Sequence, residues 1–331
     1  MGIDFLIFKN EVVGGENILK LFSKYSILKK NIYEYSNTKE LLTSCLTKKK
    51  NNTFVFTTLQ KNNILNMFFS IFKRYNPMIR ETFLYEYRKD SFINRILNYI
   101  YKLLIKITKP LVIVQSYNME RDFKNRFNYN NLMVINNPID PNVLKYSSSH
   151  SQVMEKYIIY VGRLVYDKGV QDLIEVYLKS KLPKNGVKLL IAGDGNYKDA
   201  LTKLAINSEY ADKINFLGNV SNPLPLIKDS KFLVLPSYHE GFPNVILESI
   251  GLEKIFLSNN IPSVKEMCLE DTTFLYNDKD ELLLKMNSFL KLEDSKEKEY
   301  VKYIKFLKEK YLLENIIKEF DKKIGEYIEK Y

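Results

Sequence analysis

The segment Leu235–Glu248 reads L-P-S-Y-H-E-G-F-P-N-V-I-L-E and contains two glutamates, Glu240 and Glu248, with seven residues between them. An apolar run precedes the segment, so we expect a buried strand, a loop around Gly241 and a helix that begins near Pro243. Free N–H groups at such a helix start bind hydroxyls or phosphate oxygens. The plainer interpretation is that Glu240 is an acidic loop residue and Glu248 an ordinary glutamate on a helix surface. The apolar residues around Glu248 weaken this interpretation, because a carboxylate in such surroundings needs partners.

A second group of candidates follows the strand expected at Tyr157–Val161. Gly162 ends that strand, and Arg163 and Lys168 are five positions apart in the turn before the next helix. A guanidinium fork and a compact ammonium both bind phosphate oxygens, so two cations across one turn could hold a diphosphate. The alternative is a pair of solvated surface cations, with Gly169 as an ordinary turn residue.

Other strand-end loops are also rich in glycine. Ala192-Gly193-Asp194-Gly195 and Leu217-Gly218-Asn219-Val220 follow expected strands, and Val12-Val13-Gly14-Gly15 follows the first strand of the chain. Glycine lets a ligand approach the backbone closely. None of these loops completes a G-x-G-x-x-G dinucleotide fingerprint, and an ordinary turn explains the double glycine equally well.

Apolar runs and amphipathic stretches alternate in the second half of the chain. This strict alternation predicts right-handed crossovers and a parallel sheet with helices on both faces. We expect strands at Tyr157–Val161, Lys188–Ala192, Ile214–Leu217, Phe232–Leu235 and Ile255–Ser258, and helices near Gly169–Lys179, Asn196–Asn207, Pro223–Lys228 and Pro243–Leu252. After about Asp278 the chain is expected to be helical.

The first half also reads as α/β. We expect strands at Phe5–Phe8, Thr53–Thr58, Leu111–Gln115 and Leu132–Ile135, and an amphipathic helix from Ile18. Prolines at 138 and 141 followed by Ser147–Ser149 predict a domain boundary. The chain would thus form domains 1–148 and 149–331, with the C-terminal helices crossing back to the first.

Composition excludes several classes of protein. The 331 residues suit two domains, and no apolar run approaches the length that spans a bilayer. We expect no signal peptide. Two distant cysteines, Cys45 and Cys268, and two histidines, His150 and His239, argue against a disulfide framework or a zinc site and suit a reducing cytoplasm.

The four strand-end loops of the second half, in this order and spacing, resemble those of retaining glycosyltransferases of the GT-B fold, family 4, the glycosyl transferases group 1. The resemblance covers about residues 157–277. Before it, the resemblance rests on Gly14-Gly15, the Val112–Ser116 strand end and Asn136–Asp140. It implies two Rossmann-like doubly wound domains facing a cleft. The domain 1–148 would bind the acceptor, and 149–331 would bind a nucleotide sugar.

The resemblance also implies roles for individual residues. Arg163 and Lys168 would bind the diphosphate and, with Glu240 facing the donor sugar, form the catalytic set, while Glu248 would accept hydrogen bonds from the ribose. No metal or cofactor is expected, and front-face attack is favoured over double displacement through Glu240. Many relatives have a histidine in the N-terminal domain, whereas this chain has none before His150. The full donor-binding set is Gly14, Gly15, Gly162, Gly193, Gly218, Asn219, Gly241, Phe242, Pro243, Asn244 and Glu248.

These roles predict transfer of a hexosyl or N-acetylhexosaminyl group from a nucleotide sugar, with UDP expected from family frequency alone. The acceptor would be a glycan or a lipid-linked sugar of a bacterial surface polysaccharide, such as lipopolysaccharide or capsule. Two alternatives remain open at this point: a nucleotide-sugar epimerase of the same fold, and a non-catalytic basic module that binds membrane or nucleic acid. A nucleic-acid partner is not expected, because such a module leaves the two glutamates unexplained.

Positive charge is concentrated in the first half. Residues 1–150 hold 23 Lys and Arg against 11 Asp and Glu, and residues 151–331 hold 27 against 28. Ser91–Thr108 reads as an amphipathic helix with Arg95, Lys102 and Lys106, and Ile64–Lys73 adds phenylalanines. We therefore expect peripheral attachment to an anionic membrane surface on the cytoplasmic side. The alternatives are that these apolar residues form ordinary core and that lysine is favoured throughout.

Overall fold

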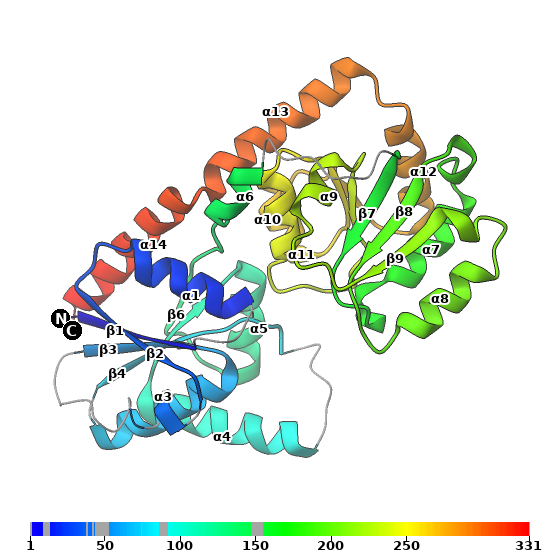
Figure 1. Ribbon diagram of the computed structural model, residues 1–331. Coiled ribbons are helices and arrows are strands. Elements are labelled where there is room, and N and C mark those ends of the chain that lie inside the picture. The colour runs from blue at the N-terminus through cyan, green and yellow to red at the C-terminus, as the bar shows by residue number, and fades with distance from the viewer. Residues whose placement is uncertain are drawn as a thin grey trace. The chain divides into compact units, whose positions relative to one another are not determined.

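The computed structural model describes residues 2–8, 14–37, 39–41, 43, 53–73, 75–85, 92–146 and 155–330. The chain divides into two compact units, residues 1–138 with 314–331 and residues 139–313, and each contains a parallel sheet flanked by helices (Figure 1). Val12-Val13, Cys45, Ser147–Ser149, His150 and the predicted boundary at 148/149 lie outside the described residues.

The first unit contains a six-stranded parallel sheet of order β2-β1-β3-β4-β5-β6. All four strands predicted for this half are present, as β1, β3, β5 and β6, whereas β2 and β4 were not predicted. The strands are β1 (Gly2–Phe8), β2 (Lys30–Tyr35), β3 (Thr53–Thr58), β4 (Asn76–Arg80), β5 (Leu111–Val114) and β6 (Leu132–Val134). Helices α1 (Gly14–Tyr25), α3 (Gln60–Lys73), α4 (Phe92–Thr108) and α5 (Tyr117–Phe127) connect them.

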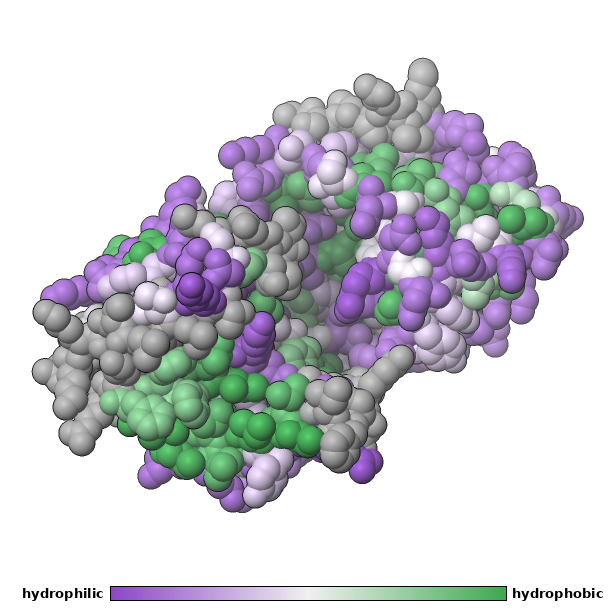
Figure 2. Space-filling model, turned by 60° about the horizontal axis from the view of Figure 1, so that its bottom comes forward, coloured by the Kyte–Doolittle hydropathy of each residue, from purple (hydrophilic) through white to green (hydrophobic). Residues whose placement is uncertain are grey.

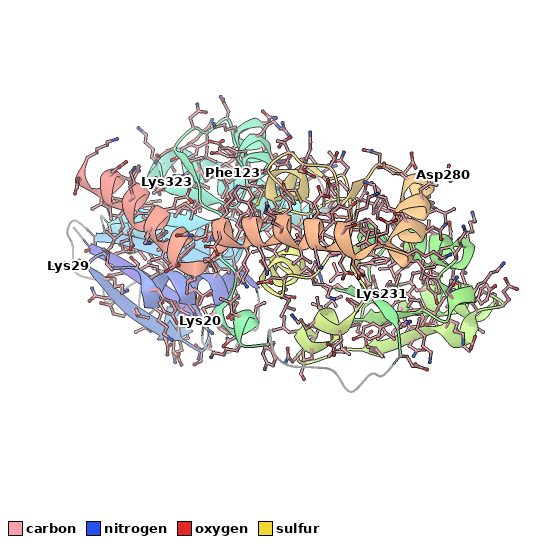
Figure 3. All side chains as sticks on the ribbon, turned by 90° about the horizontal axis from the view of Figure 1, so that it is seen from above. Lys20, Lys29, Phe123, Lys231, Asp280 and Lys323 are labelled. Carbon is pink, nitrogen blue, oxygen red and sulfur yellow. The ribbon has the colours of Figure 1, made fainter. Side chains whose placement is uncertain are left out.

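The last helix of the chain, α14 (Leu313–Glu329), completes the core of the first unit. Phe320 is fully buried, and its ring stacks on that of Phe22 in α1 with centroids 4.6 Å apart. Phe5 and Phe56 of the sheet lie within 6.5 Å of the same ring. Lys323, labelled in Figure 3, donates a hydrogen bond of 2.9 Å to the carbonyl oxygen of Val134 in β6. Side chains from both ends of the sequence therefore share one core.

The second unit has the strand order β12-β11-β10-β7-β8-β9, again parallel. Each strand and helix predicted between residues 155 and 260 is present, with its ends shifted by at most two residues. The strands are β7 (Tyr157–Val161), β8 (Lys188–Ala192), β9 (Ile214–Gly218), β10 (Leu233–Leu235), β11 (Phe256–Asn259) and β12 (Leu275–Tyr276). The helices are α6 (Pro141–Lys145), α7 (Val170–Lys179), α8 (Lys198–Ile206), α9 (Leu224–Asp229), α10 (Asn244–Gly251), α11 (Pro262–Met267), α12 (Lys279–Leu290) and α13 (Asp294–Tyr311).

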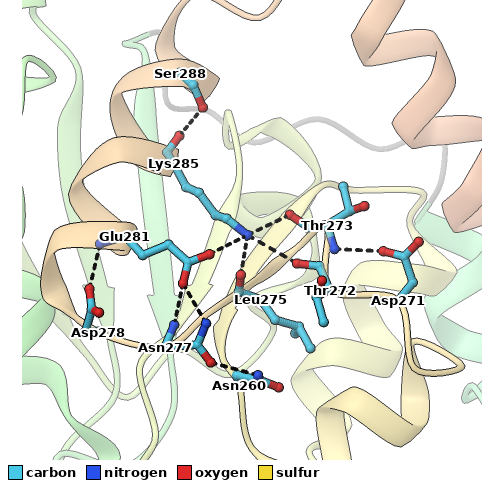
Figure 4. A network of polar contacts seen from close by, with 10 residues as sticks. All are labelled: Asn260, Asp271, Thr272, Thr273, Leu275, Asn277, Asp278, Glu281, Lys285 and Ser288. Carbon is cyan, nitrogen blue, oxygen red and sulfur yellow. Dashed lines mark hydrogen bonds and ion pairs between the residues drawn. The ribbon is translucent and has the colours of Figure 1, made fainter.

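A polar network fixes the short edge strand β12 to α12 (Figure 4). Asp278 caps α12 by accepting a hydrogen bond of 2.8 Å from the backbone N–H of Glu281. Lys285 forms an ion pair of 3.2 Å with Glu281, and it donates hydrogen bonds to three carbonyl oxygens before and within β12, those of Thr272, Thr273 and Leu275. The network satisfies backbone acceptors at the sheet edge.

None of the described helices has the length and apolar character needed to cross a membrane.

We predict that replacing Phe320 with alanine destabilises the first unit by about 3–5 kcal/mol, because the change leaves a cavity among buried aromatic rings. Urea unfolding followed by circular dichroism measures the loss. The matched control is Phe306→Ala on α13, whose ring is 60% exposed and should cost well under about 1 kcal/mol. Equal effects of the two variants would contradict the assignment of α14 to this core.

Candidate active site

The carboxyl ends of β10, β7, β8 and β9 lie next to one another, because these parallel strands are neighbours in the sheet. The candidate loops of the second half therefore share one edge: Gly162–Lys168 after β7, Gly193–Gly195 after β8, Gly218-Asn219 at β9 and Ser237–Pro243 after β10. Ligands of open parallel sheets bind at this edge. The edge belongs to the second unit alone.

A pocket of about 240 Å³ opens between three of these loops. Four of the predicted site residues line it: Gly162, Arg163, Gly193 and Asn219. The other lining residues are Val161, Ala192, Asp194, Val220 and Pro223. Lys168, Glu240 and Glu248 are not among the lining residues. The structure therefore divides the predicted site into a glycine-lined pocket and a set of charged residues outside it, on the neighbouring loops and α10.

The loops after β7 and β8 approach each other closely at glycine. A Cβ atom on Gly193 would lie 1.8 Å from the carbonyl oxygen of Gly162, and one on Gly195 would lie 2.2 Å from that of Leu164. Backbone hydrogen bonds connect the loops, from Gly162 N to the Ala192 oxygen at 3.0 Å and from Leu164 N to the Asp194 oxygen at 2.8 Å. Glycine is required here because any side chain would force the two strand ends apart.

Lys168 and Glu240 form an ion pair, and both side chains are mostly buried. Glu240 is fixed twice more: Ser237 Oγ donates to its Oε1 at 2.8 Å, and Ser263 Oγ donates to its backbone oxygen at 2.9 Å. The contacts of the carboxylate with Lys168 and Ser237 both fall on Oε1. The second oxygen, Oε2, has no hydrogen bond or ion pair with a described residue, so it can accept a bond from a ligand hydroxyl.

The turn that carries Lys168 packs against the loop after β10. Gly169 has a left-handed backbone with φ of +65°, and a Cβ there would lie 2.1 Å from the carbonyl oxygen of Pro236. The N–H of Tyr238 donates a hydrogen bond of 3.1 Å to the carbonyl oxygen of Asp167. This contact between neighbouring loops brings Lys168 and Glu240 together although they are 72 positions apart in the sequence.

Arg163 is exposed at the pocket, and its guanidinium forms no ion pair with a carboxylate of the described residues. Asp194 lines the same pocket, but its carboxylate accepts hydrogen bonds from Gly195 N at 2.7 Å and from Lys198 at 3.3 Å. The Gly195 N–H and the Lys198 ammonium lower the pKa of Asp194. The pocket therefore offers one cation for an incoming anion, while its carboxylate is already compensated.

Glu248 lies five residues into α10 and is partly buried. Burial raises its pKa to about 7, and the charge of Asp140 adds to the increase. Its carboxylate has no hydrogen bond or ion pair with any described residue. A carboxylate in this environment is destabilised when ionised and would gain from hydroxyl donors.

Gly218 is the last residue of β9, and its carbonyl oxygen accepts a hydrogen bond of 2.8 Å from the N–H of Gly193. The other predicted residues fall into two groups. Gly14 and Gly15 begin α1 in the first unit, so they belong to a different unit from the pocket. Gly241, Pro243 and Asn244 lie in the loop and first turn of α10. The ring of Phe242 is buried and packs on Tyr311 with centroids 6.0 Å apart, which leaves only its backbone to contact a ligand.

Sequence reasoning missed the residues that hold the loop after β10 in place. Tyr238 donates a hydrogen bond of 3.0 Å to Asp172 of α7, and Asp172 pairs with Lys279 of α12 at 2.7 Å. Burial and the Asp172 carboxylate raise the pKa of Tyr238 to about 12, so its hydroxyl remains a donor at neutral pH. Ser237 and Ser263, which bind Glu240, were also missed. Ser237 and Tyr238 lie three and two positions before Glu240, but sequence spacing does not indicate partners on α7 or α11.

Within the described residues, no three histidine, cysteine, aspartate or glutamate side chains are grouped so that they could hold a metal ion. His239 is half-buried, and its Nε2 lies 4.0 Å from an oxygen of Asp167.

The known proteins to which this chain is similar in sequence include several glycosyltransferases. Residues 145–308 match the family described as Glycosyl transferases group 1. An uncharacterized glycosyltransferase of Methanocaldococcus jannaschii is 38% identical over 99 residues, which cover 29% of this chain and 25% of that protein. The N-acetylgalactosamine-N,N'-diacetylbacillosaminyl-diphospho-undecaprenol 4-alpha-N-acetylgalactosaminyltransferase of Campylobacter jejuni is 30% identical over 171 residues, 50% of this chain and 45% of that protein. The alignments thus span a quarter to about half of these relatives.

One solved structure of another protein aligns with this chain over its whole length. The crystal structure of Anabaena HepE in complex with UDP-glucose superposes with a TM-score of 0.76 at 16% identity, and the alignment covers 100% of both chains. The fold is therefore the GT-B fold of two Rossmann-like domains, as the sequence predicted, and the second unit carries the sequence pattern of the group 1 glycosyl transferases.

We predict that Gly193→Ala disrupts the pocket, because the added methyl group cannot fit beside the Gly162 carbonyl. Differential scanning calorimetry should show a loss of several degrees in the melting temperature of the second unit. Gly325→Ala in α14 is the control: its Cβ would lie 3.6 Å from the side chain of Leu28, an ordinary contact distance, and alanine favours a helix. Tolerance of both substitutions would show that the strand ends can separate freely.

We predict that Glu248→Gln stabilises the protein in a pH-dependent way. A folded-state pKa near 7 against an unfolded value near 4.5 means that native Glu248 loses stability as pH rises from about 4.5 to 7. The gain of the variant should be small at pH 5 and about 1–3 kcal/mol at pH 8. Urea titrations at both values measure it, with Glu326→Gln on the exposed face of α14 as control. A gain that does not change with pH would contradict burial of an ionisable carboxylate.

Proposed function

We propose that the protein is a retaining glycosyltransferase of family 4 that moves a hexosyl or N-acetylhexosaminyl group from a UDP-sugar to a glycan or lipid-linked acceptor. The observation that carries the proposal is the Lys168–Glu240 ion pair on the loops next to the glycine-lined pocket. Arg163 lines that pocket. Cations, backbone N–H groups and an oriented carboxylate at one edge of a parallel sheet suit a diphosphate with a sugar attached.

The diphosphate would lie between the glycine loops, with Arg163 and Lys168 on its oxygens. Negative charge grows on the diphosphate as the bond to the sugar breaks, and fixed cations stabilise it without reorganisation. Lys168 is held by Glu240, while the Arg163 guanidinium has no carboxylate partner among described residues. Two cations, one of them held by Glu240, would do the work that a divalent metal does elsewhere, so we infer that transfer needs no metal.

Glu240 would bind hydroxyls of the donor sugar through Oε2, the carboxylate oxygen that Lys168 and Ser237 leave available. A carboxylate held by an ammonium, a serine hydroxyl and a fixed backbone is well placed to orient the sugar. Its charge is partly neutralised by Lys168, which makes it a weaker nucleophile. We therefore favour front-face attack by the acceptor, with the leaving phosphate taking the proton, over a covalent intermediate on Glu240.

Glu248 would accept hydrogen bonds from the ribose hydroxyls. Two hydroxyl donors would stabilise the ionised form and lower its pKa from about 7. Binding would then release a proton near neutral pH, and donor affinity should fall as pH drops below 7 because the protonated acid accepts less well.

The acceptor would be a component of a bacterial surface polysaccharide, lipopolysaccharide or capsule, assembled on the cytoplasmic side of the membrane. The similarity of half of this chain to the Campylobacter jejuni transferase, whose name specifies a diphospho-undecaprenol acceptor, supports a lipid-linked substrate. The excess of Lys and Arg in residues 1–150 suits an acceptor that carries phosphate.

We predict that Glu240→Gln and Lys168→Met each lower kcat about 100-fold or more, since removal of one electrostatic contact in a transition state has effects of this size. Arg163→Met should weaken UDP binding about tenfold or more. Isothermal titration with a panel of nucleotide sugars identifies the donor, mass spectrometry of turnover gives rates, and NMR of the product establishes the anomeric configuration.

Lys213→Met serves as the control, because Lys213 pairs with Asp212 on the surface of the second unit and does not line the pocket. It should leave both donor binding and turnover unchanged. Normal turnover of both Glu240→Gln and Lys168→Met would overturn the site, and an inverted product would overturn the retaining mechanism while leaving the donor site intact.

A further inference from the structure

Helices α3 and α4 of the first unit expose a broad apolar surface, which we name the α3–α4 face. The two helices pack side by side, and Figure 2 shows the hydrophobic area over them. From α3 the exposed side chains are Phe68, Ile71 and Phe72, and from α4 they are Ile96, Tyr99, Ile100, Leu103 and Ile107. A contiguous apolar area of this kind on a soluble unit marks an interaction site.

The α3–α4 face is not the core side of these helices. A separate set of residues fills the core: Met67 of α3 and Tyr101, Leu104 and Ile105 of α4 are buried in it. Phe72 is 64% exposed, and its ring lies 5.3 Å from that of Phe68, itself 44% exposed. The helices are thus apolar on two sides, and the core accounts for only one of them.

The charges on these helices all have one sign. The sequences of α3 and α4 contain five Lys and Arg residues and no Asp or Glu. Lys61 of α3 is exposed, as are Arg95, Lys102 and Lys106 of α4. Lysine and arginine beside exposed aromatic and aliphatic side chains are the composition of helices that lie in the headgroup layer of an anionic bilayer.

The same charges argue against a second copy of this chain as the occupant. A two-fold dimer through the α3–α4 face would bring identical patches together. Lys102 and Lys106 of both copies would then come close to one another, and neither α3 nor α4 contains an Asp or Glu, so like charges would oppose association. An anionic lipid surface offers phosphate to the cations and acyl chains to the rings.

We propose that the α3–α4 face binds the surface of a membrane that contains anionic lipids, with Phe72 and Leu103 entering the boundary between headgroups and acyl chains. The proposal goes beyond the proposed function, because it concerns where the protein is held and not the reaction. Its test is a binding measurement that does not require turnover.

Vesicle co-sedimentation tests the proposal with two lipid compositions, phosphatidylcholine alone and phosphatidylcholine with about 30% phosphatidylglycerol. The full chain should sediment with the anionic vesicles at low salt, and at least tenfold less with the neutral ones. Binding should fall as salt rises, because screening weakens the cation contribution. Failure to sediment with anionic vesicles at low salt would overturn the proposal.

Two variants separate the apolar and the charged contributions. Phe72→Ser with Leu103→Ser should lower partitioning at least tenfold, and the matched control Leu284→Ser with Phe306→Ser removes one leucine and one phenylalanine of similar exposure from the second unit. Lys102→Gln with Lys106→Gln should remove the preference for anionic vesicles, and its control is Lys298→Gln with Lys302→Gln, also four positions apart on a helix.

Unchanged melting temperatures would show that these exposed positions alter binding and not folding. Equal loss in test and control variants would overturn the proposal. So would dimerisation detected by light scattering that Phe72→Ser with Leu103→Ser abolishes, since the α3–α4 face would then be a protein interface. None of these outcomes depends on whether the donor site is assigned correctly.

Discussion

The close contact between the carboxyl ends of β7 and β8 is the constraint on which the candidate site depends. Gly193 and Gly195 have no side chains, so the loop after β8 can lie directly on the carbonyl groups of Gly162 and Leu164. Residues of both loops line the pocket, and the exposed Arg163 is one of them. A similar contact, between Gly169 and Pro236, places Lys168 beside Glu240. Both arrangements follow from backbone packing, and the charged groups occupy positions that packing has already fixed.

The second unit could be predicted well because its signals are local. Strands β7, β8 and β10 are mostly apolar runs followed directly by glycine or proline, as expected for strands buried on both faces. In the first unit, β2 was missed because most of its side chains are exposed. The strand β4 was missed because Pro77 lies inside it, and proline lowers the strand signal. Both strands form only because their neighbours in the sheet provide hydrogen-bond partners.

The sequence indicated which residues belong to the candidate site, but not which of them contact one another. The order of strands brings β10 next to β7, and this long-range pairing makes the Lys168–Glu240 contact. The sequence suggested that Glu240 and Glu248 touch different parts of one long ligand, and the structure gives the two carboxylates different environments. Glu240 is paired with a lysine, whereas Glu248 has no ion pair or hydrogen bond with the residues that the structure describes and has a raised pKa. Ser263 could not be foreseen, because its link to Glu240 depends on how α11 follows β11.

The position of Phe320 in the first core has a consequence for synthesis of the chain. The ribosome delivers β1, α1 and β3 early, but the ring that stacks on Phe22 arrives only with the last helix. The second unit has all of its residues before then and can fold first, although it follows in the sequence. Until residues 314–330 emerge, the aromatic core of the nascent first unit is incomplete, and its exposed rings make this intermediate prone to aggregation.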